Sequence, residues 1–151
     1  MWDKTRQGID LELRQLNTLV DHYHSLLEKV AASEPNDMEV AALGAMLHSF
    51  YNGVENIFKR IALEIDHAPP SGLSWHSELL EAMARPAAQR PAVFTAALQD
   101  RLWDYLEFRH VFRSAYSFIL KWDKMAPLVH ACAETLQSLE AELRTFMRRL
   151  D

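Results

Sequence analysis

The sequence predicts an all-α protein, an up-and-down bundle of four long helices and one short helix. Two observations support this fold class. Glycine and proline are scarce, with four and six copies in 151 residues, and long helices tolerate few of either. Apolar residues recur at alternating intervals of three and four along four long stretches, which places them on one face of a helix. A chain of this length can bury one core, so we expect a single domain over residues 1–151.

Interruptions of the apolar pattern separate the predicted helices. Pro35 cannot continue a helix, and Asn36 or Asp37 can cap the helix that follows. The connection is short, so the first two helices are predicted to be antiparallel neighbours. Asp123 can cap the last long helix. The other long helices are expected at about residues 4–32, 38–66 and 92–121, and the short helix at about 75–84.

Two glycines fall inside the second predicted helix. Gly44 and Gly53 each cost roughly 1 kcal/mol relative to alanine in a helix interior. We therefore expect a neighbouring helix to pack closely at these positions.

Composition excludes several classes of protein. The net charge of −5 argues against a general nucleic-acid coat protein, because phosphate neutralisation dominates such binding. It still allows a local basic pocket. The single cysteine, Cys132, cannot form an internal disulfide framework and fits a reducing compartment. No apolar run approaches about 18 residues, and no secretory leader is evident. We therefore predict a cytoplasmic protein with no membrane span.

One spacing is similar to that of a metal site. Glu64 and His67 form an ExxH pair, as used in ferritin-like di-iron bundles. Such a site needs a second ExxH pair and two further glutamates, and the sequence has no second pair. We therefore predict neither a metal site nor a cofactor.

The densest group of chemically capable side chains lies between residues 109 and 116. In a helix at about 100° per residue, Arg109, Arg113 and Tyr116 share one face. His110 and Ser114 share a neighbouring face, one turn apart, and could hydrogen-bond. Two stacked guanidinium groups repel unless an anion lies beside them, and phosphate matches their planar fork of donors. This face is therefore a candidate phosphate site.

Spacing alone leaves an alternative without a ligand. Arg109 and Arg113 can instead pair with Asp104, Glu107 or acidic residues on other helices. Under that alternative the run is an ion-paired helix surface with no binding role.

The stretch from Leu102 to Tyr116 resembles the signature of HepT-like HEPN toxins, which reads Arg, four residues, His, one residue, Tyr. Arg109 and Tyr116 match the first and last positions. The position after the arginine is usually polar in that family, as His110 is here. The resemblance extends over nearly the whole chain. The other similar segments are residues 50–61 in the second helix, Pro69–Gly72, Trp75–His76 and Leu79–Leu80 in the middle, and Trp122, Met125 and Pro127 near the start of the last helix.

This resemblance implies a HEPN-like bundle that forms a homodimer and brings two copies of the motif helix into one cleft. It implies metal-independent cleavage of RNA, in which Arg109 binds phosphate and stabilises the charged transition state. The family histidine moves protons during attack by the ribose 2′-hydroxyl, a role that suits a pKa near neutrality. The implied partner is a minimal nucleotidyltransferase antitoxin.

Tyr116 matches the family tyrosine that such a partner can modify with AMP. The modification would place a bulky anion beside Arg109 and Arg113 and block RNA. The alternative is a half-buried helix tyrosine whose hydroxyl caps a neighbour.

Ser114 stands where the family has its histidine. A serine hydroxyl is not ionised near neutral pH and cannot replace imidazole as a general base, and losing such a group costs about 10²–10⁴ in rate. The chain is then either a ribonuclease whose activity is weakened or rescued by His110, or a catalytically silent module that still binds its antitoxin. A generic helical scaffold is a third alternative, which requires the resemblance to be accidental.

Overall fold

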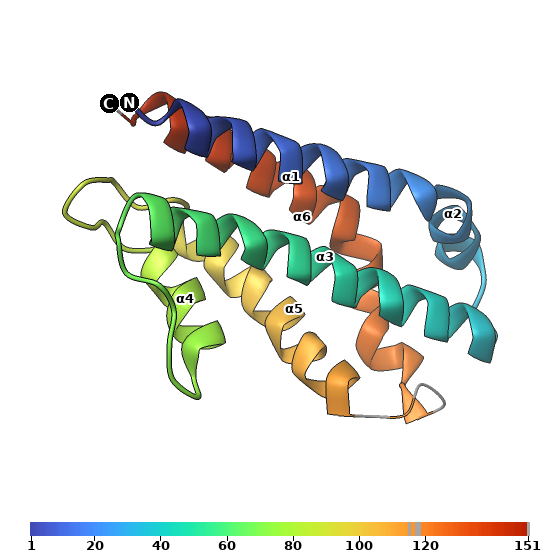
Figure 1. The fold of residues 1–151 in the computed structure, drawn as a ribbon. Helices are drawn as coiled ribbons and strands as arrows, with labels where there is room; N and C mark the ends of the chain where they lie inside the picture. Colours follow the sequence, from blue (N-terminus) through green and yellow to red (C-terminus); the bar gives the residue numbers. More distant parts are fainter. Residues whose placement is uncertain (115, 117–118, 151) are drawn as a thin grey trace.

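The computed structural model describes residues 1–114, 116 and 119–150, and these form an all-α bundle, as predicted. Its helices are α1 (Asp3–His22), α2 (His24–Ala32), α3 (Asp37–Glu64), α4 (Trp75–Met83), α5 (Ala96–Ser114) and α6 (Trp122–Arg148). Helices α1 and α3 run antiparallel, α5 lies along α3, and α6 returns beside α1, so the two termini meet at one end (Figure 1). None of the helices in the described residues has the length and apolarity needed to cross a membrane.

Helix α3 occupies the centre of the bundle. It begins with the predicted cap, because Asn36 Oδ1 accepts from the Glu39 amide at 2.9 Å and the Glu39 carboxylate accepts from the Asn36 amide at 3.0 Å. Helices α1, α4, α5 and α6 all pack against it. Its completely buried apolar side chains include Leu43, Met46, Phe50, Val54, Ile57, Phe58 and Ile61.

Both glycines of α3 lie at close helix contacts, as predicted. A methyl group on Gly53 would lie 2.6 Å from Leu16 Cδ2 of α1. A methyl group on Gly44 would lie 2.9 Å from Leu120 Cδ1 and 3.0 Å from Phe112 Cε1 of α5. The absence of side chains at these positions lets α1 and the end of α5 approach α3.

The predicted first long helix is two helices. Tyr23 leaves helical geometry, with φ −95° and ψ 6°, so α1 ends at His22 and α2 begins at His24. The apolar periodicity continues through this break, and neither proline nor glycine marks it. The change of direction lays α2 against α6 and buries Val30. Burial against another helix, rather than local propensity, decides where α1 ends.

The predicted start of the third long helix, near residue 92, is also wrong. Helix α5 begins at Ala96, because Thr95 Oγ1 accepts from the Leu98 amide at 3.3 Å, the bond of an N-terminal cap. The residues just before it are not helical, and Val93 donates from its amide to the Met83 carbonyl at 2.8 Å. This contact holds the start of α5 against the end of α4.

Helix α5 ends at Ser114, not near residue 121 as predicted. Leu120, beyond the end of α5, packs close to α3. Helix α6 begins at Trp122, so Asp123 lies in its first turn and does not cap it. A carboxylate at this position still favours the helix, because it lies near the positive end of the helix dipole.

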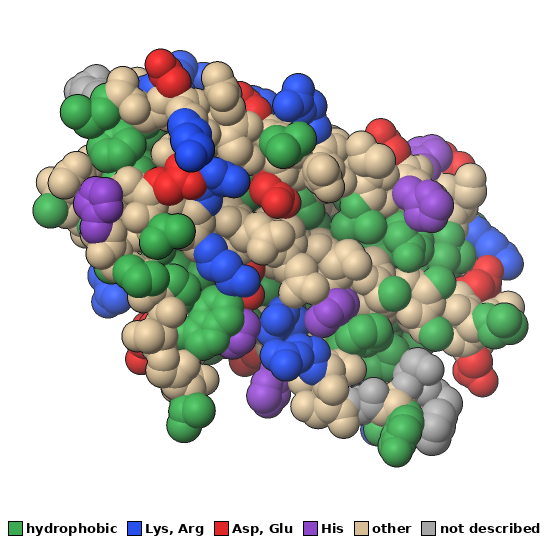
Figure 2. Space-filling view, viewed as in Figure 1, with side chains coloured by type: hydrophobic (Ala, Val, Ile, Leu, Met, Phe, Trp, Pro, Cys, Tyr) green, Lys and Arg blue, Asp and Glu red, His purple; other side chains and the backbone are tan. Residues whose placement is uncertain are grey.

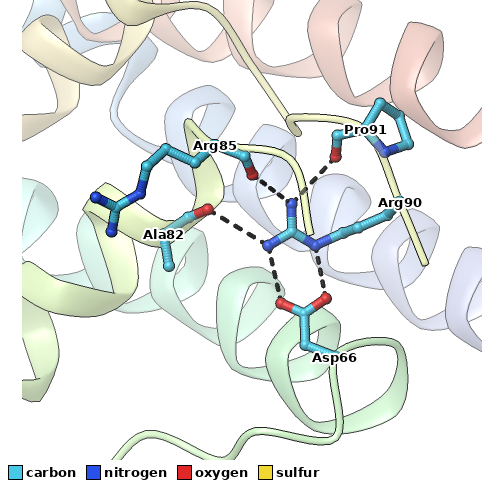
Figure 3. Close-up of polar contacts among 5 residues, drawn as sticks. All are labelled: Asp66, Ala82, Arg85, Arg90 and Pro91. Carbon is cyan, nitrogen blue, oxygen red and sulfur yellow. Dashed lines mark hydrogen bonds and ion pairs between the residues drawn. The ribbon is translucent and has the colours of Figure 1, made fainter. Parts of the chain in front are cut away.

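A buried ion pair fixes the segment that joins α4 to α5. Arg90, only 5% exposed, donates from Nε and Nη2 to the two Asp66 carboxylate oxygens at 2.7 and 2.8 Å (Figure 3). Its remaining donors reach the carbonyls of Ala82, Arg85 and Pro91. One guanidinium therefore ties the segment after α3 to the end of α4 and to the loop that follows.

Replacing Arg90 should strongly destabilise the protein. In Arg90→Met, Asp66 keeps a largely buried carboxylate without its cation, and breaking a buried pair in this way costs about 3–5 kcal/mol. Urea unfolding should show this loss. Arg85→Met is the matched control, because the Arg85 side chain is exposed and points away from Arg90 (Figure 3). Equal unfolding midpoints for the two variants would contradict a stabilising role for the pair.

Candidate functional site

Arg109 lies near the end of α5 and is held against α3. Its Nε donates to Asn52 Oδ1 at 2.7 Å. The bond orients the guanidinium and leaves its two terminal nitrogens with no partner among the described residues. Arg113 follows one turn later and is exposed. The structure therefore places two guanidinium groups at the same end of α5, and only the first is held by another helix.

Neither arginine is neutralised by an acid in the part of the chain that the structure describes. Glu107, one of the expected partners, accepts from Trp103 Nε1 at 2.8 Å. Asp104 is exposed and forms no ion pair with them. The described residues therefore do not form the ion-paired surface that was the alternative for Arg109 and Arg113. Two unneutralised guanidinium groups favour an anion.

His110 and Ser114 lie on the exposed side of α5. The Ser114 hydroxyl donates to the backbone carbonyl of His110 at 3.1 Å. The hydroxyl was predicted to bond to the His110 imidazole, but it bonds to the backbone of His110 instead. Ser114 closes a bond within its own helix, and the His110 ring stays open to solvent.

Tyr116 lies beyond the end of α5 and is 74% exposed. The prediction that it continues the helical face of Arg109 and Arg113 is wrong, because the helix ends at Ser114. The alternative of a half-buried helix tyrosine is also wrong. The Tyr116 carbonyl accepts from the Ile119 amide at 3.0 Å.

His48 on α3 lies at this site and was missed by the sequence analysis. Its ring stacks on Phe112 of α5, with centroids 5.0 Å apart and planes 30° apart. Its Nδ1 is buried and has no hydrogen-bond partner among the described residues. Burial lowers the pKa of His48, and the charges of Arg109 and Arg113 lower it further. Both effects favour the neutral form of the ring.

A line of polar residues on α3 could have revealed His48. His48, Asn52 and Glu55 are spaced by four and three, so they share one face of the helix. The bond of Asn52 reaches α5 and the bond of Glu55 reaches α4, so this face contacts both helices. This repeat of polar residues at helical spacing, in the part of α3 that is richest in buried apolar residues, is the signal that the sequence offered.

The same polar line continues to α4. Glu55 is 1% exposed, and its carboxylate lies 2.7 Å from His76 Nδ1. The His76 ring stacks on Trp75, and Lys59 Nζ lies 5.0 Å from the centroid of the Trp75 ring. Tyr51 is buried beside this group, and burial together with the Glu55 charge raises its pKa. Its hydroxyl has no partner in the described residues.

The surface over these contacts is basic. Figure 2 shows Lys or Arg side chains with histidines around them, over the adjoining parts of α3, α4 and α5. We call the group formed by His48, Asn52, Arg109, Phe112 and Arg113 the α3–α5 site. It combines the fixed guanidinium of Arg109 and the exposed one of Arg113 with an imidazole, an arrangement that can hold a phosphate and accept a proton.

No group of three or more His, Cys, Asp or Glu residues suited to a metal ion occurs among the described residues. Glu64 of the ExxH pair is occupied by other contacts. Its carboxylate accepts from Thr5 Oγ1 at 2.8 Å and from Arg60 Nη1 at 2.6 Å.

A family model described as HepT-like protein matches residues 42–150. The matched range contains every residue of the α3–α5 site, together with Ser114 and Tyr116. No curated protein and no solved structure matched the chain.

His48 should make the folded protein less stable in mild acid. Its pKa is lowered from the ordinary 6.5 in the folded state, so the unfolded chain binds the proton more tightly. The free energy of unfolding therefore falls as pH drops through 6.5 towards the folded pKa. Urea midpoints at about pH 7.5 and about pH 5.5 measure this loss, which should be smaller in His48→Gln. The exposed His130→Gln variant is the control and should behave like the parent. The same pH dependence in parent and His48→Gln would contradict the assignment.

Proposed function

The chain belongs to the family of HepT-like proteins, and on that premise we propose that it is the ribonuclease half of a toxin–antitoxin pair. It acts on RNA as a homodimer, with the ends of two α5 helices facing one cleft. Its antitoxin is a minimal nucleotidyltransferase. The substrate is the phosphodiester backbone, and the reaction requires no metal ion.

The observation that carries this proposal is the state of the two arginines. Arg109 is held by Asn52, and neither it nor Arg113 is neutralised by a described acid. A guanidinium fixed in this way can bind a phosphate group. It can also stabilise the negative charge that develops on the phosphate oxygens when the 2′-hydroxyl attacks the phosphorus. A chain with net charge −5 binds RNA through such a local group rather than over its whole surface.

The reaction is attack of a ribose 2′-hydroxyl on the adjacent phosphorus. Arg109 holds the non-bridging oxygens, and Arg113, one turn away, adds a second positive charge. Proton removal from the 2′-hydroxyl accelerates this step by about 10²–10⁴ when a positioned base performs it. Ser114 does not supply that base, since its hydroxyl donates to the His110 carbonyl.

A second candidate is a catalytically silent HEPN module that binds the nucleotidyltransferase without cutting RNA. Ser114 at the position of the family histidine favours it. In this case the α3–α5 site still binds phosphate, and the dimer and the antitoxin surface are retained.

Cleavage assays should separate the two candidates. We expect the parent to cleave RNA in the presence of a chelator, and Arg109→Ala to be slower by about 10²–10³ because it loses a fixed donor to the transition state. Arg14→Ala, which removes an exposed arginine of α1, is the control and should match the parent. Cleavage by Ser114→His but not by the parent would establish the silent module. Absence of cleavage by both would refute the ribonuclease assignment.

Tyr116 should be the residue that the antitoxin modifies with AMP. It is the exposed one among the four tyrosines, since Tyr51 and Tyr105 are buried and Tyr23 is half-buried. Mass spectrometry after co-expression with the nucleotidyltransferase should find AMP on the peptide that contains Tyr116, together with reduced RNA binding. Tyr116→Phe should abolish the modification and Tyr23→Phe should not. An unmodified Tyr116 after co-expression would refute the proposal.

A further inference from the structure

The α3–α5 site has a fixed phosphate donor, Arg109, but lacks a base at the motif position. The Ser114 hydroxyl is bonded within its own helix. The His110 ring lies on the exposed side of α5, with no contact to α3 among those that the structure shows. Arg109 is held on the side of α5 that faces α3 by its bond to Asn52, so a base from this chain that serves a phosphate on Arg109 is to be sought on that side.

His48 lies on that side. It precedes Asn52 by one turn of α3, a rise of about 6 Å, and Asn52 is the residue that holds Arg109. Its ring stacks on Phe112, which lies between the two arginines in the same turn of α5. Two independent contacts, one through Asn52 and one through Phe112, therefore place the imidazole beside the guanidinium groups.

We propose that His48 is the general base of RNA cleavage in this protein, in place of the histidine that Ser114 replaces. The inference rests on the ribonuclease function proposed above. It assigns the catalytic base to α3, whereas the phosphate donors lie on α5.

The state of the imidazole suits this role. The charged groups that face it are Arg109 and Arg113 of α5, and they act together with burial to keep the ring neutral. A neutral ring can accept a proton at neutral pH. Its Nδ1 is enclosed and without a partner among the described residues, so Nε2 is the nitrogen that meets the substrate. A bound phosphate offsets the arginine charges and makes the ring a stronger base when the substrate is present.

The proposed step is a transesterification. His48 Nε2 takes the proton of the 2′-hydroxyl as the bond from the 2′-oxygen to phosphorus forms and the bond from phosphorus to the 5′-oxygen breaks. The leaving 5′-oxygen takes a proton from water, and the resulting hydroxide takes the proton from His48. The products are a 2′,3′-cyclic phosphate and a 5′-hydroxyl, with no change of redox state.

The test compares His48→Gln with the parent under single-turnover conditions. We expect cleavage to fall by about 10²–10⁴. Binding of a 2′-O-methyl RNA, which cannot be cleaved because its 2′-oxygen is blocked, should be unchanged by fluorescence anisotropy. His130→Gln is the matched control and should retain the parental cleavage rate. His110→Gln tests the rival base on α5.

The outcomes separate the two proposals. Loss of cleavage with intact RNA binding in His48→Gln supports the inference. Parental cleavage by His48→Gln, or the loss of activity in His110→Gln instead, overturns it and leaves the ribonuclease function standing. A parent that cleaves no RNA overturns both proposals.

Chemical rescue distinguishes a base from a packing residue. His48→Ala removes the ring that stacks on Phe112, and added imidazole can fill the space. Cleavage that returns in proportion to the imidazole concentration supports a catalytic role. A variant that folds and binds the 2′-O-methyl RNA but is not rescued shows that His48 acts only through packing, and overturns the inference.

Discussion

The inner faces of helix α3 are covered by its neighbours, so a polar side chain on these faces must find a partner inside the bundle or lose the free energy of its hydration. Three of its polar residues satisfy this requirement by bonding to three different helices. These bonds set how each neighbour is rotated about its axis, which the apolar contacts alone would leave loosely defined. The pairs are Glu64 with Thr5 of α1, Glu55 with His76 of α4, and Asn52 with Arg109 of α5.

Two polar atoms on the same helix are exceptions, within the part of the chain described. The Nδ1 of His48 and the hydroxyl of Tyr51 are buried without partners, and leaving such a group unpaired costs about 1–3 kcal/mol. Both residues lie within a turn of Asn52, next to the two arginines that no described acid neutralises. Unpaired polar atoms and unneutralised charges thus occur together at one place in an otherwise well-paired core. Such departures are typical of binding and catalytic sites.

The sequence predicts the elements of this fold better than their ends. Periodic apolar residues are enough to identify the long helices, and Asn36 is recognisable as a cap because its bond to Glu39 is local. The end of α1 at Tyr23 and the end of α5 at Ser114 have no such local cause. They depend on where α2 meets α6 and where Leu120 meets α3. The spacing of apolar residues within one segment does not predict such contacts with a distant segment.

The site was predictable to the extent that it lies on one helix. Arg109 and Arg113 were identified from the motif on α5, whereas His48 lies on α3 and joins them only through Asn52 and Phe112. A motif on one helix identifies only the site residues of that helix. Ser114 in place of histidine therefore indicates that the motif position on α5 does not supply the base. It does not show that the site has none, because α3 brings a neutral imidazole to the same arginines. The chemistry of the site therefore has to be judged from the packing of α3 on α5 rather than from the motif alone.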